Sequence, residues 1–594
     1  MLRVSRPHAA LLLITAFIAS IMTPTATLAA TKQPTATGRG GAIATVDLEA
    51  SDAGMEILKA GGNAVDAAVA AAAVLGVTEP FSCGIGGGGF MVIYRASDKS
   101  VTTIDHRETA PEEMHPRSFF ENGAPLAFDD ARFSGLSAGV PGTVRGWSRA
   151  LARYGTMSLR KALQPARQVA REGFEIDQTF FDQTQGNVDF FDDVPSTAAL
   201  YLDRDGTPRD VGTTFTNPDL ANTYARIARR GARGFYRGAV ANAMAEAVRH
   251  PPVAPDANHA WRPGVMTSSD VASYVAPERK PTRVGYRGVD VFGMGPPSSG
   301  GSTVGEALNI LKGFRMSRLD REEALHDYLE SSRYSFADRN AYLADPDFFD
   351  VPLAGLLSNS FAAERRGLIT EQAATSPVDP GDPYPHQGDS APSAARASAT
   401  VNRGASTTHL TVSDRWGNVV SYTFTIESTG GNGIVVPGWG FLLNNELTDF
   451  NFDSTTHPNR VEGGKRPRSS MSPTIVLRDG RPLVAVGSPG GSTIITTVLQ
   501  ILVNRFDFRM SLPEAIAAPR LSQRNTTTTQ AEPTFLNTPQ AAALRDRGHQ
   551  FVETAEIGAA TGIAFLRRGL VQAAAEPSRR GGGSALVESS ERRR

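Results

Sequence analysis

Two alternating segments, residues 406–414 and 419–426, constrain the fold of this chain more than any other feature. In the first segment polar residues alternate with Thr408, Leu410 and Val412, which is typical of a half-buried β-strand. The three residues between the segments end in Gly417, which suits a type I turn followed by a left-handed residue. If Asp414 faces Asn418, antiparallel pairing sets position 407 opposite position 425. The sequence therefore predicts a hairpin with two facing threonine hydroxyls. An ordinary hairpin, with threonines present only for β-propensity, is the alternative.

Further motifs surround this hairpin, and their order along the chain is informative. They are Gly61–Ala68, Gly86–Met91, Asp105–Pro111, Phe336–Arg339, Thr407–His409, Thr425–Glu427, Leu442–Phe450, Arg466–Thr474 and Gly487–Ser492. Together they resemble the γ-glutamyltransferases, also called glutathione hydrolases, over roughly residues 40–580. The resemblance implies an α+β fold, a four-layer αββα sandwich of the N-terminal-nucleophile hydrolase type. It also implies a substrate class, glutathione or other γ-glutamyl compounds, with amino acids or peptides as acceptors and no cofactor.

The resemblance implies that the chain cuts itself between Ser406 and Thr407. The products would be a large subunit, residues 31–406, and a small subunit, residues 407–594, which stay associated and build one αββα unit. Thr407 would then be the nucleophile, because the α-amine of a new N-terminal threonine can take up the proton of its own hydroxyl. Such an amine has a pKa near 8, so part of it is unprotonated at neutral pH. Thr425 would hydrogen-bond beside it.

The remaining site residues also follow from the resemblance. The N–H groups of Gly490 and Gly491 correspond to an oxyanion hole, because glycines let the backbone approach a developing charge. A γ-glutamyl group carries an α-carboxylate and an α-ammonium, so its pocket needs a cationic fork and carboxylates. The carboxylate side corresponds to Arg107, Ser469 and Ser470. The ammonium side corresponds to Glu427, Glu446 and Asp449.

Three departures from the family pattern bear on the donor. Glu427 and Glu446 stand where some members carry Asn or Gln, and residues 428–433 lack the aromatic residue common before the first glycine of that turn. The stretch between Phe450 and Arg466 is shorter than in members with a lid loop. Two other functions stay open: a related glutaryl or cephalosporin acylase, and an uncleaved, inactive binding protein. Because a glutaryl group lacks the α-ammonium, the three acidic residues argue against the acylase.

Composition and the N-terminus indicate the compartment. The net charge of -1 gives no field that would attract nucleic acid or an anionic membrane, and the single cysteine, Cys83, allows no intrachain disulfide. Residues 1–30 are typical of a secretory signal, with cleavage after Ala29 or Ala30. The sequence therefore predicts a secreted or periplasmic protein without stable membrane insertion, an uncleaved membrane anchor being the alternative. Residues 376–406 are rich in Pro, Ala, Ser, Asp and Gly and predict a mobile segment before the cleavage site.

Several other patterns indicate helices or resemble known functional motifs. Asn63 is a suitable N-cap for a helix over 64–75, and a long helix is expected over 321–344. The glycine run 84–89 satisfies G-x-G-x-x-G, but a helix precedes it and a strand follows, the reverse of a dinucleotide site. Ser137 lies in a G-x-S-x-G pattern without the leading strand of a hydrolase nucleophile. No His or Cys spacing predicts a metal site.

Overall fold

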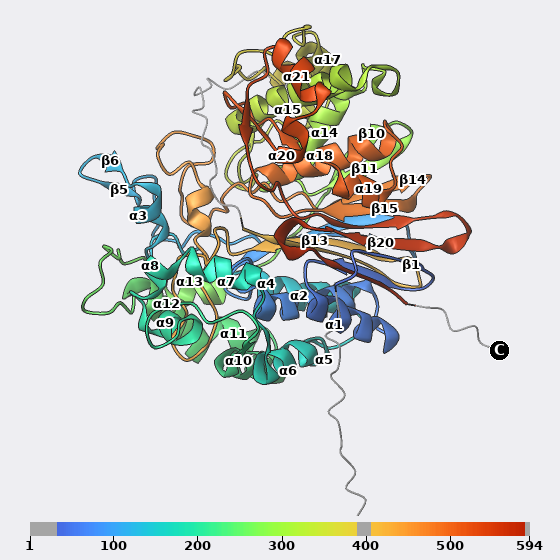
Figure 1. Cartoon of the computed structure of the whole chain (residues 1–594). Helices are drawn as coiled ribbons and strands as arrows, with labels where there is room; N and C mark the ends of the chain where they lie inside the picture. The colour runs from blue at the N-terminus through green and yellow to red at the C-terminus, as the bar shows by residue number, and fades with distance from the viewer. Residues whose placement is uncertain (1–31, 389–405, 589–594) are drawn as a thin grey trace, which may run out of the picture. The chain divides into compact units, whose positions relative to one another are not determined.

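The computed structural model describes residues 32–388 and 406–588, and its centre is a pair of facing seven-stranded sheets (Figure 1). Within each sheet all neighbouring strands are antiparallel. Sheet A has the order β1 (Thr35–Gly38), β20 (Val571–Ala575), β19 (Thr561–Phe565), β15 (Arg481–Gly487), β14 (Thr474–Arg478), β11 (Val289–Gly293) and β10 (Thr282–Tyr286). Sheet B has the order β21 (Ser584–Val587), β2 (Ala42–Thr45), β12 (Thr408–Ser413), β13 (Val419–Thr425), β3 (Gly88–Arg95), β4 (Ser100–Asp105) and β9 (Glu278–Arg279).

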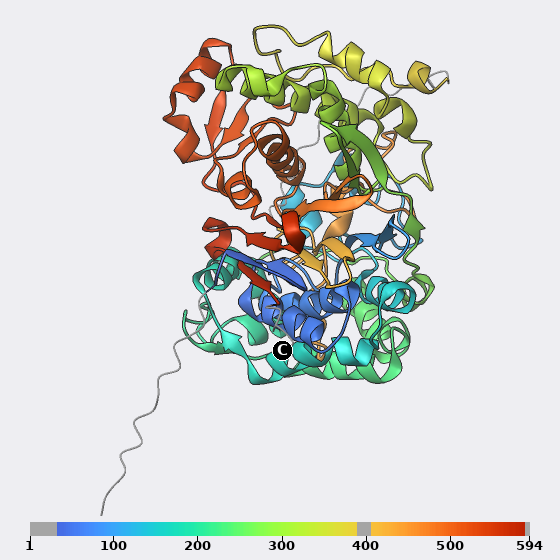
Figure 2. The same ribbon diagram turned by 90° about the vertical axis from the view of Figure 1, so that its right-hand side faces the viewer.

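Helices cover the outer face of each sheet, which completes the expected four layers. Against sheet B lie α1 (Leu48–Lys59) and α2 (Ala64–Thr78), below the sheets in Figures 1 and 2. Against sheet A lie α14 (Gly300–Leu311), α18 (Thr493–Phe506) and α19 (Leu512–Ala517), with α15 (Arg321–Tyr342) packed on α14. The predicted αββα sandwich is therefore confirmed, and so is a long helix beginning at residue 321.

The remaining elements extend the two helical layers. On the α2 side follow α3 (Phe128–Arg132), α4 (Thr143–Tyr154), α5 (Leu159–Ala162), α6 (Gln164–Glu172), α7 (Gln178–Gln185), α8 (Val188–Phe191), α9 (Pro195–Tyr201), α10 (Pro218–Arg230), α11 (Arg233–Tyr236), α12 (Ala239–Arg249) and α13 (Ser268–Ser273). On the α15 side follow α16 (Leu353–Leu356), α17 (Asn359–Arg366), α20 (Pro533–Leu536) and α21 (Pro539–Asp546). Small sheets are formed by β5 (Phe120–Glu121) with β6 (Ala124–Pro125), β7 (Phe174–Glu175) with β8 (Thr214–Phe215), and β16 (Leu521–Ser522) with β17 (Thr529–Ala531) and β18 (Phe551–Glu553).

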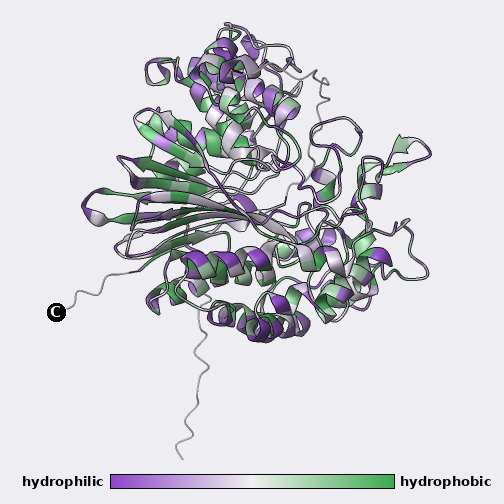
Figure 3. Cartoon of the chain, turned by 180° about the vertical axis from the view of Figure 1, so that it is seen from behind, coloured by the Kyte–Doolittle hydropathy of each residue, from purple (hydrophilic) through white to green (hydrophobic). Residues whose placement is uncertain are grey.

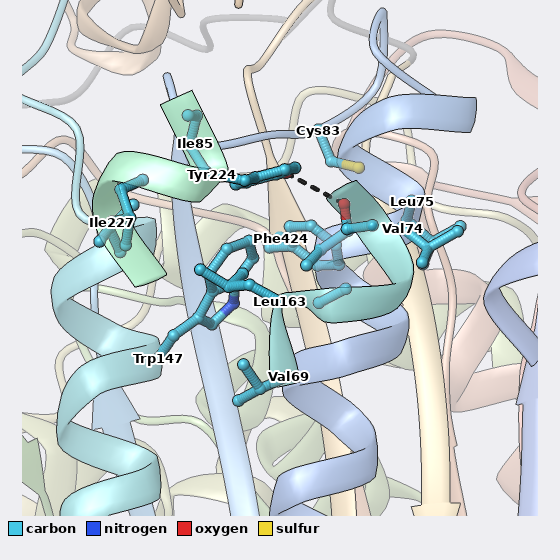
Figure 4. Packing of buried hydrophobic residues seen from close by; sticks show 14 of the residues in the cluster. Val69, Val74, Leu75, Cys83, Ile85, Trp147, Leu163, Tyr224, Ile227 and Phe424 are labelled. Atoms are coloured by element: carbon cyan, nitrogen blue, oxygen red, sulfur yellow. Dashed lines mark hydrogen bonds between the residues drawn. The ribbon is translucent and has the colours of Figure 1, made fainter. Parts of the chain in front are cut away.

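Helix α2 is buried along its whole length, because sheet B covers one side and α4 and α6 cover others. Its alanine-rich sequence is apolar all round, as expected of a core helix. Figure 4 shows the packing around it, where the Tyr224 hydroxyl donates to the carbonyl of Ala73 at 3.0 Å. Asn63 caps the helix as predicted, accepting from the N–H groups of Val65 and Asp66. The helix ends at Thr78, about one turn beyond the expected end at residue 75, and the added residues 76–78 are buried like the rest of the helix.

The hairpin β12–β13 has the predicted register. His409 pairs with Thr423, and the turn closes through Gly417, whose φ is 89°. The expectation of a half-buried strand is wrong, because both faces of β12 are buried. One face, with Leu410, packs on the α2 layer, and the other faces sheet A, where Thr411 donates to the Thr561 carbonyl at 3.4 Å. Figure 3 shows the corresponding hydrophobic colour along the strands, with hydrophilic colour gathered on the helices and at the strand ends.

Residues before and after position 407 contribute strands to both sheets. In sheet B, β12 lies between β2 and β13, and β13 pairs with β3 along its whole length. In sheet A, β11 pairs with β14, and β1 pairs with β20. The two predicted subunits are thus interleaved by backbone hydrogen bonds.

The predicted mobile segment is described only in part. Residues 389–405 lie outside the described residues, as do the predicted signal residues 1–30. Residues 376–388 are anchored: Gly381 donates to Asp338 at 2.6 Å, Val378 donates to Asn525 at 2.7 Å, and Tyr384 is buried in the short helix η2 (Tyr384–Gln387).

Candidate active site

The hairpin brings Thr407 and Thr425 together at the end of sheet B. Their Oγ1 atoms lie 3.0 Å apart, and both residues are buried. Thr425 Oγ1 also accepts from the backbone N–H of Glu427 at 2.9 Å. Because a hydroxyl has one proton and two lone pairs, Thr425 Oγ1 can also donate to Thr407 Oγ1 or accept from it. The geometry suits a nucleophilic oxygen held in place by a neighbouring hydroxyl.

Thr407 itself has a strained backbone. Its φ is 112°, a region that costs a β-branched residue on the order of 1–3 kcal/mol. Two contacts hold it there: Arg580 donates to the Thr407 carbonyl at 2.8 Å, and Ser406 Oγ donates to the Phe81 carbonyl at 3.0 Å. Arg580 is in turn fixed by Glu79 at 3.0 Å. The strain lies at the peptide bond that the sequence predicts to be cut.

A pair of backbone donors faces the same space. Neither the N–H of Gly490 nor that of Gly491 donates to another residue in the described part of the chain. Both precede α18, whose N-terminus carries the positive end of the helix dipole. A side chain at position 490 would meet Thr493 Oγ1 at 2.6 Å, and its φ is 129°, so glycine is required there. The two N–H groups can receive a developing negative charge.

Arg107 lies at the centre of a buried acidic cluster. Its guanidinium pairs with Glu446 and, at 2.5 Å, with Asp449, and it donates to the carbonyls of Pro467 and Arg468 at 3.1 and 3.2 Å. Although burial disfavours its charge, the two carboxylates hold the pKa of Arg107 above its ordinary value. Burial in turn raises the pKa of Glu446 well above the ordinary value. The protonation of these groups depends on neighbouring charges, so a charged ligand would change it.

Glu427 adds a further carboxyl to the cluster. Its Oε2 accepts from Ser428 Oγ and from Asn445 Nδ2, the latter at 2.6 Å. Burial and then the charge of Asp449 raise the pKa of Glu427 to about 7. Glu427 has a φ of 79°, which directs the chain sharply away from β13. The residue is therefore close to half-ionised at neutral pH.

Ser469 and Ser470 are placed by the other helical layer. Ser470 Oγ accepts from Arg339 Nη2 at 2.7 Å, and the Ser469 carbonyl accepts from Ser299 Oγ at 2.6 Å. Arg339 also donates to Ser299 at 2.8 Å. The contacts explain the arginine of the motif Phe336–Arg339, for which the sequence alone gave no role: it fixes the serine loop from α15.

One cavity brings most of the predicted site residues together. It contains about 250 Å³ of unfilled space and is lined by Arg107, Thr407, Thr425, Glu427, Glu446, Asp449, Ser469, Ser470 and Gly491, together with Met471 and Ile494. Gly490 and Ser406 lie next to lining residues but do not line it. Met471 and Ile494 were not expected, although both lie within or just after quoted motifs. No residue between 450 and 468 lines the cavity.

Glu108 is a site residue that sequence reasoning missed. Its side chain is completely buried, and burial raises its pKa to about 8. Neither of its carboxyl oxygens has a hydrogen-bond partner among the described residues, and the charge of Arg107 opposes the effect of burial on its pKa. The signal was available, because Glu108 follows Arg107 in the motif Asp105–Pro111. The sequence does not predict that Glu108 belongs to the acidic cluster, because nothing in the sequence shows that its side chain points inward.

The glycine run 84–89 serves packing at this site. A Cβ atom on Gly87 would lie 2.0 Å from the Thr425 carbonyl, and one on Gly86 would lie 1.9 Å from the Leu442 carbonyl. The run thus lets the start of β3 approach the end of β13. Ser137 is a buried loop serine that donates to the Arg132 carbonyl at 2.6 Å, away from the cavity.

Within residues 32–388 and 406–588, no group of three or more His, Cys, Asp or Glu side chains is arranged to hold a metal ion. No helix in the same ranges is long and apolar enough to cross a membrane.

Comparison with known proteins identifies the family. The model of the family described as gamma-glutamyltranspeptidase matches residues 50–586. The chain belongs to this family. It is 39% identical over 489 residues to a glutathione hydrolase proenzyme of Bacillus subtilis (strain 168), covering 82% of this chain and 81% of the relative.

The chain is also similar to proteins named as acylases. The chain is 35% identical over 556 residues to the acylase ACY 1 proenzyme of Pseudomonas sp. (strain SE83), covering 92% of this chain and 93% of the relative. Its fold matches the crystal structure of a cephalosporin acylase from Bacillus halodurans with a TM-score of 0.82 and 27% identity, covering 96% and 99% of the two chains. The N-terminal-nucleophile hydrolase fold is thus shared by both kinds of enzyme.

Proposed function

We propose that this chain is the precursor of a γ-glutamyltransferase and glutathione hydrolase that cuts itself between Ser406 and Thr407. The observation that carries the proposal is the pairing of Thr407 Oγ1 with Thr425 Oγ1 in a cavity that also holds Arg107 and its carboxylates. The glutathione hydrolase proenzyme among the relatives supports the same reading.

Self-cleavage needs only groups at the scissile bond. Thr407 Oγ1 attacks the Ser406 carbonyl carbon, the C–N bond breaks, and the released Thr407 nitrogen takes up the hydroxyl proton, which leaves an ester. Water then hydrolyses the ester to give the Ser406 carboxylate and a free Thr407 amine. Because an N-terminal residue has no preceding carbonyl, the cut also removes the steric cause of the strain at φ 112°.

The mature site would transfer the γ-glutamyl group. The α-carboxylate of the donor binds Arg107 with Ser469 and Ser470, and the α-ammonium binds the carboxylates of Glu427, Glu446 and Asp449. Thr407 Oγ1 attacks the γ-carbonyl carbon as its proton passes to the Thr407 amine. The oxyanion is stabilised by the N–H groups of Gly490 and Gly491. The amine then protonates the leaving nitrogen, and water or an amino-acid or peptide amine resolves the acyl-enzyme.

A glutaryl or cephalosporin acylase is the second candidate, favoured by the 35% identity to an acylase proenzyme. A glutaryl donor has no ammonium, so it leaves the carboxyl groups of Glu427 and Glu446 without a cation from the ligand. Three acidic residues line the cavity, Glu427, Glu446 and Asp449, and the last two pair with Arg107, which favours the γ-glutamyl donor. The predicted signal of residues 1–30 places the mature enzyme in the secreted or periplasmic compartment.

The test compares maturation with activity. Purified wild-type protein should give two bands, the smaller beginning Thr-Thr-His, and should hydrolyse glutathione and γ-glutamyl anilides in preference to a glutaryl anilide. Thr407→Ala should give one uncut, inactive chain. Thr408→Val is the matched control, because the Thr408 hydroxyl has no partner among the described residues and faces away from the cavity. A small band with another N-terminus, or a preference for the glutaryl anilide, would contradict the proposal.

A further inference from the structure

A second, larger cavity adjoins the γ-glutamyl cavity, and we call it the outer groove. Its unfilled space, open solvent included, is about 1680 Å³, and it is lined by Phe128, Asp129, Arg132, Gln178, Thr179, Asp182, Gln183, Gly186, Asn187, Ser428, Thr429, Glu556, Arg580 and Gly581. The much smaller γ-glutamyl cavity, at about 250 Å³, leaves no room for the rest of a peptidic donor. That remainder must lie outside it.

The outer groove and the γ-glutamyl cavity share a wall. Ser428 and Thr429 of the groove directly follow Glu427 of the cavity, and Ser428 Oγ donates to the Glu427 carboxylate. Arg580 of the groove donates to the carbonyl of Thr407. A donor whose scissile carbonyl lies at Thr407 therefore has the groove beside it.

Arg132 is the unusual charge in the outer groove. It extends from α3 across the turn that follows Glu427, donating to the carbonyls of Thr429 and Gly431 and, at 2.9 Å, to Asn187 Oδ1. It forms no ion pair with a carboxylate of the described residues, although the charges of Glu427 and Asp129 act on it from a distance, and only its Nε and Nη2 donate in these three hydrogen bonds. Burial lowers the pKa of Arg132 to about 10, so it remains charged at neutral pH.

The other charges of the groove differ from Arg132. Arg580 is already paired with Glu79. Asp129, Asp182 and Glu556 are exposed, so water and salt screen them from a ligand. A largely buried guanidinium that forms no ion pair can bind a carboxylate directly, because the charge is screened less there than at the exposed acids.

We propose that the outer groove holds the leaving part of a peptidic γ-glutamyl donor and that Arg132 binds the C-terminal carboxylate of that part. The assignment rests on the proposed function, since it takes the γ-glutamyl group to occupy the cavity at Thr407. It makes Arg132 a specificity-determining residue for free peptides over donors whose leaving group is neutral. The substrate class that results is γ-glutamyl peptides with an ionised C-terminus.

The experiment uses three donors on the mature enzyme: a γ-glutamyl dipeptide with a free C-terminal carboxylate, the same dipeptide as its C-terminal amide, and a γ-glutamyl anilide. In wild type kcat/KM should be about tenfold higher for the free acid than for the amide, as one charge-assisted hydrogen bond would give. Arg132→Gln should abolish that preference through KM, so that the acid-to-amide ratio of kcat/KM falls to about one; the anilide measures any effect on the shared γ-glutamyl site, because the charge of Arg132 lowers the pKa of Glu427.

The controls separate binding from structural damage and from general charge. Asp182→Asn changes the groove charge by the same one unit and should keep the tenfold preference. Equal rates for acid and amide in wild type, or an equal loss for all three donors in Arg132→Gln, would overturn the assignment. Wild-type enzyme inactive on the anilide would instead contradict the γ-glutamyl function itself.

Discussion

Among single residues, Glu427 links activity to pH. Its carboxyl has a pKa of about 7, so it is neutral in acid and ionised above neutrality. Because only the carboxylate attracts the donor ammonium, the ratio of kcat/KM for a γ-glutamyl anilide to that for a glutaryl anilide should rise as pH increases through about 7. The ratio cancels the titration of the Thr407 amine, which acts on both donors.

The matched variant for this prediction is Glu427→Gln. The amide keeps the size of the side chain and does not titrate, so the ratio should become nearly flat between pH 6 and 8 and lower at its upper end. A glutamine variant with the wild-type profile would assign the titration to another group.

The identities of the site residues could be predicted from motif order, whereas their mutual contacts could not. The sequence assigned Arg107 to a ligand carboxylate, but it does not show that the same guanidinium is bound by Glu446 and Asp449 in the uncut chain. Glu108 was missed for a related reason: burial decides whether an acidic residue belongs to a site, and burial depends on packing from several segments distant in sequence. The roles of these residues stay predictions.

At the level of secondary-structure elements, the contact between β3 and β13 depends on Gly87. A Cβ atom at this position would lie 2.0 Å from the Thr425 carbonyl, far inside van der Waals contact. Gly87→Ala should therefore move Thr425 away from Thr407 and slow self-cleavage at least tenfold, measured as the half-time for appearance of the small band after refolding or synthesis.

A control glycine lies in sheet A. Gly285 in β10 is exposed, and the atom nearest to an added Cβ would be the Val289 carbonyl oxygen at 3.9 Å, so Gly285→Ala should cut normally. Rapid cleavage in Gly87→Ala would show that the strands yield without disturbing the two hydroxyls.

The register of β12–β13 followed from loop length and alternation alone, because these are local properties of a hairpin. Its burial did not follow. A polar face of Thr407, His409 and Thr411 resembles a solvent-facing strand, yet it faces sheet A. Its polar atoms are satisfied by Thr425 and Thr423 of the neighbouring strand β13 and by the Thr561 carbonyl of sheet A. Burial lowers the pKa of His409 to about 3, so this histidine is neutral and serves packing.

For the whole molecule, the interleaved strands predict that the cut chain stays together. After cleavage at residue 406, β12 remains hydrogen-bonded to β2, and β13 remains bonded to β3. The two pieces should elute as one particle of the same size as the uncut Thr407→Ala protein and separate only in denaturant. Size-exclusion chromatography followed by a denaturing gel is the measurement. Separate elution in native buffer would contradict the interleaved arrangement.

The interleaving also sets an order of events in the life of the protein. The backbone around the proposed cut is held by Arg580 and by the Phe81 carbonyl, which lie far from Thr407 in sequence, so a chain still being made or still unfolded has not assembled the site. The catalytic amine is created inside a finished molecule. Only correctly folded molecules should therefore become active. A misfolded copy stays a single inactive chain, and no active enzyme forms before the sandwich is complete.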